Sequence, residues 1–268
     1  MDQEHKPVPP KSVTGRALSV LGAFDVQHPE LTLTELAKRT GLALATAYRL
    51  AGDLEKEQYL VRDGEGMYRL GTRLWEMGVL TPLHGRLRES AMPFLLNLQY
   101  DCRETVQLAI REGTDGIYVE KLTLETSVPV QSRIGARIPL HATGIGKSLL
   151  AFAPEGFLEA FLQLPMAAYS ETTITNPHEL ARELRVIRRQ GFSESNQEYH
   201  AGSTSIAAPV VVDGVAVAAV GIVNYELRDN LRIYKDRLLE MANGLAARMQ
   251  ESKGIAYPAL TGINGAED

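Results

Sequence analysis

The chain has 268 residues, of which 44% are apolar and 23% are charged, the composition of an ordinary soluble globular protein of one or two domains. Its only cysteine is Cys102, which excludes an internal disulfide framework and a cysteine-rich metal site. The net charge is −5. Residues 1–73 hold ten basic and ten acidic side chains, so the excess of acidic side chains lies in residues 74–268. This balance permits nucleic-acid binding by the N-terminal part, with modest non-specific affinity.

No targeting signal and no membrane span is predicted. The first residues lack a basic stretch followed by an apolar core, which excludes a secretory signal. The longest apolar run, residues 206–223, is interrupted by Pro209 and by Asp213-Gly214 and is rich in β-branched residues. It therefore predicts two strands joined by a turn. We expect a reduced, cytoplasmic protein with no membrane partner.

An arm and a short helix are expected at the N-terminus. Three prolines among polar residues predict a flexible arm over residues 1–12. Thr14 is suited to cap a helix from Gly15 to about Phe24, because a threonine oxygen can accept from a free N–H of the first helical turn.

Residues 33–60 predict two helices that cross at a tight turn. Apolar residues recur at three- and four-residue steps: Leu33, Leu36 and Ala37 in the first helix, and Leu44, Ala47, Leu50, Ala51 and Leu54 in the second. Thr32 or Thr34 is the expected cap of the first helix, and the second extends to about Gln58. Gly41 provides the turn, since glycine adopts a positive φ at low steric cost. The pattern is that of a helix-turn-helix or of an ordinary helical hairpin.

A short hairpin is predicted directly after these helices. Residues 59–62 and 67–70 resemble strands, and the Asp-Gly-Glu-Gly sequence at 63–66 is typical of the turn between them. Three helices followed by a two-stranded hairpin predict a winged helix-turn-helix over residues 13–71. This order makes an ordinary helical hairpin much less favoured.

The second helix of the pair is the expected DNA-reading helix. Opposite its apolar side it carries Ala45, Thr46, Tyr48 and Arg49. Arg49 can offer two parallel donors to guanine or hold a phosphate. Further candidates for DNA contact are Lys11, Arg16 and Arg62. Each position, taken singly, is equally consistent with a solvated surface residue.

A linker helix is expected over residues 72–84. It begins at Thr72, runs until Pro82 and carries several large apolar residues. These residues pack either against a partner subunit or within their own chain.

The second domain, residues 85–253, alternates helices and strands. Helices are expected at 87–100, 148–152, 156–162, 177–190 and 230–252, and strands at 105–110, 116–122, 128–132, 205–212 and 215–223. Most strands are neighbours joined by short turns, so we predict an α+β fold with a mainly antiparallel sheet and helices on its faces. Residues 254–268 are expected to form a loose tail.

No catalytic, cofactor or metal site is predicted in this domain. The Gly-Lys-Ser sequence at 146–148 lacks the glycine that a phosphate loop requires at position 141. The glycine-rich turn instead either offers free N–H groups to a carboxylate or simply packs. Residues 191–195 lack the last glycine of a nucleophile elbow, and the six histidines show no metal-ligand spacing.

Several segments together resemble the IclR family of bacterial transcriptional regulators over residues 13–253. The segments that carry the resemblance are GRALSVLGAF, LTLTELAKRTGLALATAYRLAGDLEKEQYL, the YRLG after the hairpin, GARIPLHATGIGKSLLA and GFSESNQEYHAGSTSIAAPV. The last two are the most specific. The resemblance implies a winged helix-turn-helix, a linker helix and a GAF-like effector domain in a homodimer or tetramer.

The resemblance also implies an effector pocket. The N–H groups of Gly144 and Ile145 would hold a carboxylate, and Val130 and Ile138 would form apolar walls. Where members that bind small oxo-acids carry polar groups, this chain has Ser195, Ser205, Gly221 and Val223, and His141 completes the candidate set. The less polar lining favours a larger, partly aromatic acid or amide over a glyoxylate-like effector.

We therefore expect a DNA-binding repressor of a small-molecule catabolic operon, which binds a near-palindromic operator as double-stranded DNA. An enzyme acting on a small acid, with the winged domain as an interaction module, is the alternative.

Overall fold

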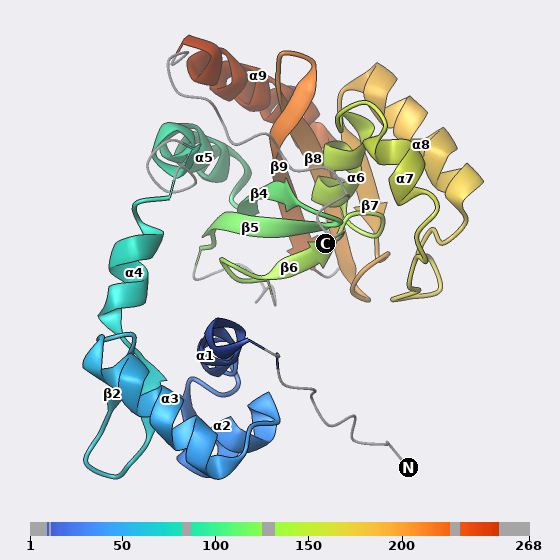
Figure 1. The fold of residues 1–268 in the computed structure, drawn as a ribbon. Helices are drawn as coiled ribbons and strands as arrows, with labels where there is room; N and C mark the ends of the chain where they lie inside the picture. The colour runs from blue at the N-terminus through green and yellow to red at the C-terminus, as the bar shows by residue number, and fades with distance from the viewer. Residues whose placement is uncertain (1–9, 11, 82–86, 125–131, 226–230, 252–268) are drawn as a thin grey trace. The chain divides into compact units, whose positions relative to one another are not determined.

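The chain forms two compact units, residues 1–81 and residues 82–268. The computed structural model describes residues 10, 12–81, 87–124, 132–225 and 231–251 (Figure 1). Several predictions lie outside these residues: nearly all of the flexible arm with Lys11, the end of the linker, Val130 with most of the strand at 128–132, and the tail at 254–268. Within the described ranges, no helix is long and apolar enough to cross a bilayer.

The first helix, α1 (Val13–Leu21), begins earlier than the sequence suggested. Ser12, not Thr14, is its N-cap: the Ser12 backbone is extended and its Oγ accepts from the Gly15 N–H at 2.9 Å. Thr14 already lies inside the helix, so the predicted cap was wrong.

Helices α2 (Leu33–Thr40) and α3 (Leu44–Lys56) form the helix-turn-helix. Thr32 caps α2 in a reciprocal arrangement, since its Oγ1 accepts from the Glu35 N–H and the Glu35 carboxylate accepts from the Thr32 N–H. Gly41 ends α2 with a φ of 68°. Ala47, Leu50 and Ala51 of α3 are buried as predicted, and they join the core of this unit. Leu44 was predicted there too, but it is 52% exposed because it lies in the first turn of α3.

The wing is a three-stranded antiparallel sheet in the order β1-β3-β2. Strands β2 (Leu60–Arg62) and β3 (Tyr68–Leu70) form the predicted hairpin, whose turn is held by Asp63 Oδ1 as it accepts from the N–H groups of Glu65 and Met67. Strand β1 (Glu30–Leu31) was not predicted, because two residues give no periodicity. The winged helix-turn-helix is confirmed.

Helix α4 (Thr72–Gly78) follows the wing and ends before the predicted Pro82. Its large apolar side chains are poorly covered: Trp75 is 70% exposed and Met77 is also exposed, as is Leu80 just after the helix. These residues form an exposed apolar surface at the end of the first unit.

The second unit is built on a six-stranded antiparallel sheet in the order β6-β5-β4-β9-β8-β7 (Figure 1). The strands are β4 (Thr105–Glu112), β5 (Asp115–Leu122), β6 (Arg137–Pro139), β7 (Ser193–Asn196), β8 (Ser203–Val212) and β9 (Val215–Tyr225). The short edge strands β6 and β7 were not predicted. Pro139 is tolerated because it ends an edge strand, where its missing N–H costs no central pairing.

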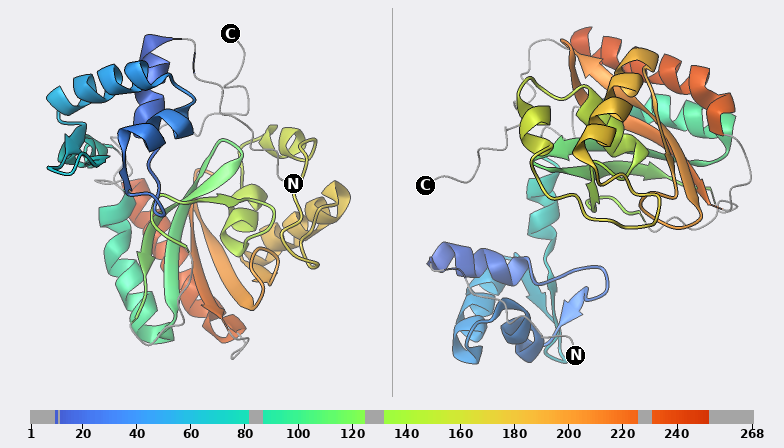
Figure 2. Two further views of the ribbon diagram at one scale, coloured as in Figure 1. Left: turned by 90° about the horizontal axis from the view of Figure 1, so that it is seen from below. Right: turned by 90° about the vertical axis from the view of Figure 1, so that its right-hand side faces the viewer.

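Helices cover both faces of this sheet (Figures 1 and 2). The helices of one face are α5 (Glu89–Cys102) and α9 (Lys235–Glu251), with the 3-10 helix η2 (Leu231–Tyr234) before α9; those of the other are α6 (Gly144–Ala151), α7 (Phe157–Phe161) and α8 (Pro177–Gln190). Helix α6 begins four residues before the predicted start, since Thr143 caps it. The predicted α+β fold with an antiparallel sheet is confirmed.

Candidate functional site

The exposed face of α3 carries the predicted DNA contacts, and we call it the reading face: Ala45, Thr46, Tyr48 and Arg49. Tyr48 is 58% exposed, Ala45 is exposed and Thr46 is half-buried. Arg49 forms an ion pair with Asp53 of the same helix at 3.5 Å, and both side chains are more than half exposed. Such surface pairs contribute about 0–1 kcal/mol, so Arg49 can leave Asp53 for a base edge or a phosphate at little cost.

The other basic candidates lie on α1 and on the wing. Arg16 donates to the Ser12 carbonyl at 3.4 Å, and the Arg62 guanidinium lies 5.3 Å from the centre of the Tyr68 ring. Arg39, by contrast, is engaged in holding the fold, since it binds Asp25 at 2.5 Å and the Ala23 carbonyl at 2.7 Å.

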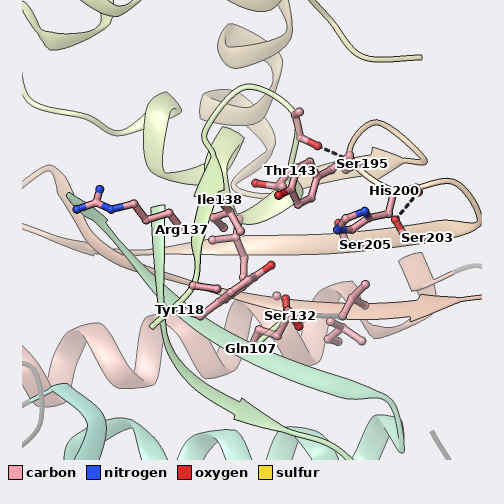
Figure 3. A pocket seen from close by; sticks show the side chains of 18 residues that line it. Gln107, Tyr118, Ser132, Arg137, Ile138, Thr143, Ser195, His200, Ser203 and Ser205 are labelled. Carbon is pink, nitrogen blue, oxygen red and sulfur yellow. Dashed lines mark hydrogen bonds between the residues drawn. The ribbon is translucent and has the colours of Figure 1, made fainter. Parts of the chain in front are cut away.

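A cavity of about 100 Å³ lies in the second unit, where the start of α6 meets the sheet (Figure 3). Seven of the nine predicted effector residues line it: Ile138, Gly144, Ile145, Ser195, Ser205, Gly221 and Val223. The structure thus brings together residues that are up to 85 positions apart between Ile138 and Val223. Val130 lies outside the described residues.

His141 does not line the cavity, contrary to the prediction. Its side chain is buried and its Nε2 lies 2.9 Å from the Ala167 carbonyl oxygen, while its ring centre is 5.9 Å from that of Tyr169. These contacts hold the loop after α7, so the role of His141 in the structure is to support that loop.

The start of α6 presents two backbone donors. Thr143 Oγ1 accepts from the Gly146 N–H at 3.0 Å and donates to the Pro139 carbonyl. The N–H groups of Gly144 and Ile145, in the first turn, have no acceptor within the helix. Both residues line the cavity, so an anion there can accept from these groups at the positive end of the helix.

Glycines let α6 approach the sheet closely. A Cβ on Gly144 would lie 2.8 Å from Ser205 Oγ, and one on Gly221 would lie 2.8 Å from Ile145 Cγ1. The room above Gly221 is therefore filled by Ile145 and not left for a ligand. The small residue at 221 fixes the position of the helix; it does not enlarge the pocket.

Several lining residues were missed by the sequence analysis, and they supply polar and aromatic groups: Gln107, Tyr118, Ser132, Arg137, Thr143, Tyr199, His200 and Ser203. Burial lowers the pKa of His200, which favours its neutral form. Arg137 pairs with Asp115 at 3.1 Å. The two-residue alternation of the strands predicts which side chains share a face with Gln107 and with Tyr118. It does not predict which other strands complete the cavity.

A buried ion pair fixes one wall of the cavity. Lys147 of α6 is 1% exposed, and its Nζ lies 2.7 Å from Glu198 Oε1 and 3.6 Å from Glu183 of α8. Tyr199 and His200, which line the cavity, directly follow Glu198. The pair thereby connects the helix that supplies the backbone donors to the segment that closes the other side.

The serine of the elbow-like sequence, Ser193, and the single cysteine of the sequence, Cys102, are both structural. Ser193 Oγ donates to the Gly144 carbonyl at 2.6 Å and lies 2.9 Å from Ser148 Oγ, so it fastens α6 to β7. Cys102 is buried at the end of α5, and burial raises the pKa of its thiol to about 11. A thiol with that pKa is not ionised at neutral pH, which removes its nucleophilic form.

Two family descriptions match the chain: the IclR helix-turn-helix domain over residues 13–64 and the bacterial transcriptional regulator IclR C-terminal domain over residues 77–250. The HTH-type transcriptional regulator KipR of Bacillus subtilis is 32% identical over 90% of this chain and 96% of KipR. The HTH-type transcriptional repressor AllR of Escherichia coli is 28% identical over 77% of this chain and 78% of AllR.

Among solved structures, an IclR homolog from Microbacterium hydrocarbonoxydans, complexed with 4-hydroxybenzoate, superposes with a TM-score of 0.85. The two sequences are 30% identical, and the match covers 90% of this chain and 100% of the homolog's chain. These matches span both units and set aside the enzyme alternative, because the family consists of regulators. The chain belongs to the IclR family of DNA-binding transcriptional regulators.

Proposed function

We propose that the protein represses a small-molecule catabolic operon and that a small aromatic acid, bound in the cavity, controls its affinity for the operator. The observation that carries this proposal is one cavity that combines apolar walls with the two backbone donors of Gly144 and Ile145. AllR, which is named a repressor, and the relative complexed with 4-hydroxybenzoate support it.

The lining of the cavity favours an acid with an apolar body. None of its described lining residues is acidic, so no carboxylate in the wall opposes an anion at the start of α6. Ile138, Ile145 and the ring of Tyr118 provide apolar contacts. The volume of about 100 Å³ is of the same order as that of a cavity of about 150 Å³ that binds benzene in another protein, so the ligand is expected to contain no more than one ring.

The DNA-binding unit is expected to act in pairs. Two copies of α3 in a dimer would read half-sites of a near-palindromic operator about one helical turn or more apart. The exposed Trp75, Met77 and Leu80 on and after α4 offer an apolar surface for the partner subunit. A tetramer would place two such pairs on the DNA.

A mobility-shift titration with the DNA upstream of the protein's own gene tests the proposal. Benzoate or 4-hydroxybenzoate should change the affinity for that DNA by about 5- to 150-fold, the usual range of coupling between two sites. Glyoxylate should not change it. Tight binding of glyoxylate, with no response to the aromatic acids, would contradict the proposed effector class. Sedimentation analysis of the same sample measures the oligomeric state.

A further inference from the structure

Gln107 places a primary amide in the wall of the cavity. It lies on β4, lines the cavity and is 3% exposed. Its Nε2 donates to Ser132 Oγ at 2.5 Å, the one hydrogen bond of this side chain among the described residues. An amide has two N–H donors and a carbonyl acceptor, so one N–H and the Oε1 atom remain for a bound molecule.

The sheet register shows which residues lie beside this amide. Gln107 is paired with Gly221 on β9, and Gly221 is paired with Ala207 on β8. Paired residues point to the same face of an antiparallel sheet, so the row on the β9 side of Gln107 holds no side chain larger than a methyl group, and Ile145 of α6 packs above Gly221. On the β5 side Gln107 is paired with Lys121, whose Nζ donates to the Ser132 carbonyl at 2.7 Å. The bond to Ser132 orients the amide plane in the wall of the cavity.

The amide and the helix donors lie at different ends of the cavity. In Figure 3, Gln107 and Ser132 lie at the lower end, Thr143, which caps α6, lies at the upper end, and Ile138 lies between these levels. A ligand that fills the cavity therefore meets anion-binding N–H groups at one end, apolar side chains in the middle, and a neutral donor-acceptor pair at the other end.

We propose that Gln107 determines effector specificity by hydrogen-bonding a hydroxyl group on the side of the ring opposite the carboxylate. The inference rests on the proposed function and deepens it from an aromatic acid to a hydroxylated aromatic acid. A hydroxyl matches the amide because it donates to Oε1 and accepts from the free N–H. An unsubstituted ring would leave the second N–H and the Oε1 atom of the buried amide unpaired. Sites built to bind a hydroxyl discriminate strongly against ligands that lack it.

Calorimetric titration of the full-length protein with three probes tests this inference: benzoate, 2-hydroxybenzoate and 4-hydroxybenzoate. The protein should bind 4-hydroxybenzoate about 10- to 100-fold more tightly than benzoate. 2-Hydroxybenzoate should gain nothing over benzoate, because its hydroxyl lies beside the carboxylate. In Gln107→Leu, which preserves size and removes both hydrogen-bonding groups, 4-hydroxybenzoate should bind no better than benzoate, while benzoate binding stays within about 3-fold.

Gln163→Leu is the matched control, since Gln163 is exposed just after α7 and does not line the cavity. It should keep the full preference of the unchanged protein. Should Gln107→Leu unfold, as judged by circular dichroism, Ser132→Ala replaces it. That variant removes the orienting bond and should reduce the preference for 4-hydroxybenzoate at least 3-fold.

The outcomes separate this inference from the proposed function. If both acids bind and the variants keep the preference, Gln107 is not the selecting residue. Equal binding of 2- and 4-hydroxybenzoate by the unchanged protein would likewise overturn the role of Gln107. If no aromatic acid binds to the unchanged protein, the proposed effector class is wrong, and this inference is wrong with it.

Discussion

Helices α3 and α6 both begin after a turn, yet they differ in burial and in the groups that they present. Helix α3 has a buried side and a reading face whose side chains are largely exposed. Every residue of α6, from Gly144 to Ala151, is buried, and what it presents to the cavity is mainly backbone. A helix that offers side chains to a ligand can change specificity by surface substitution, whereas one that offers backbone N–H groups depends on being held in place.

The contrast extends to the charged residues of the two helices. Arg49 of α3 has a weak partner, Asp53, at the surface, while Lys147 of α6 is fully enclosed with Glu198. Surface pairs contribute little to the free energy of unfolding, but removing one member of a buried pair leaves an uncompensated charge. The same kind of substitution should therefore have very different consequences in the two helices.

The largest effect is expected for Lys147→Met. Loss of the ammonium group leaves the Glu198 carboxylate buried, and one of its oxygens, Oε2, already has no hydrogen-bond partner among the described residues. The free energy of unfolding of the second unit should fall by about 3–5 kcal/mol. Urea unfolding followed by circular dichroism measures this change.

Two further variants control the Lys147 experiment. Lys56→Met, in the exposed last turn of α3, should change stability by less than about 0.5 kcal/mol. Adding Glu198→Gln to Lys147→Met should recover part of the loss, because the second substitution removes the unpaired charge. A double variant that loses the sum of both single effects would show that the pair is not coupled.

A smaller effect is expected from adding a methyl group to a glycine of each helix. In Gly146→Ala, the new Cβ would lie 2.4 Å from the Leu140 carbonyl oxygen and 2.5 Å from its Cα, and this backbone cannot rotate away. The variant should lose about 3 kcal/mol of stability, near the upper end for overpacked positions. Gly52→Ala in α3 should instead gain about 0.5–1 kcal/mol, since no neighbouring group in the described part of the chain lies within 4 Å of the added Cβ. Thermal unfolding of both variants compares them; a stable Gly146→Ala would mean that α6 can move away from the sheet.

The DNA-binding unit was largely predictable from the sequence because its signals are local. The buried positions of α3 recur within one helix, Gly41 marks the turn, and the Asp63 turn marks the wing. The errors are local as well: Ser12 took the place of Thr14 as a cap, since both residues have a suitable side chain.

The cavity was predictable only in part because it is assembled from distant strands. Alternation along β4 shows that Gln107 shares a face with its second neighbours, but the strand order β5-β4-β9-β8 decides what lies beside it. The glycine-rich turn that contains Gly144 was identified as a candidate carboxylate site from the residues alone, and Gly221 through the family resemblance. His141 was wrongly predicted to line the cavity. A motif gives the position of a side chain in the sequence but not the direction in which it points.

Substitution on the reading face should have the smallest effect on stability. It should change the affinity for DNA instead. Arg49→Ala should weaken binding to the upstream DNA by about 1–3 kcal/mol, or roughly 5- to 150-fold, if the guanidinium contacts a base edge. Arg49→Lys separates two contacts, because an ammonium can replace a phosphate contact but not the two parallel donors to guanine. Arg185→Ala, at an exposed position of α8, is the control and should bind as before. Unchanged binding by Arg49→Ala in a mobility-shift titration would place the reading function on other residues of α3 or on the wing.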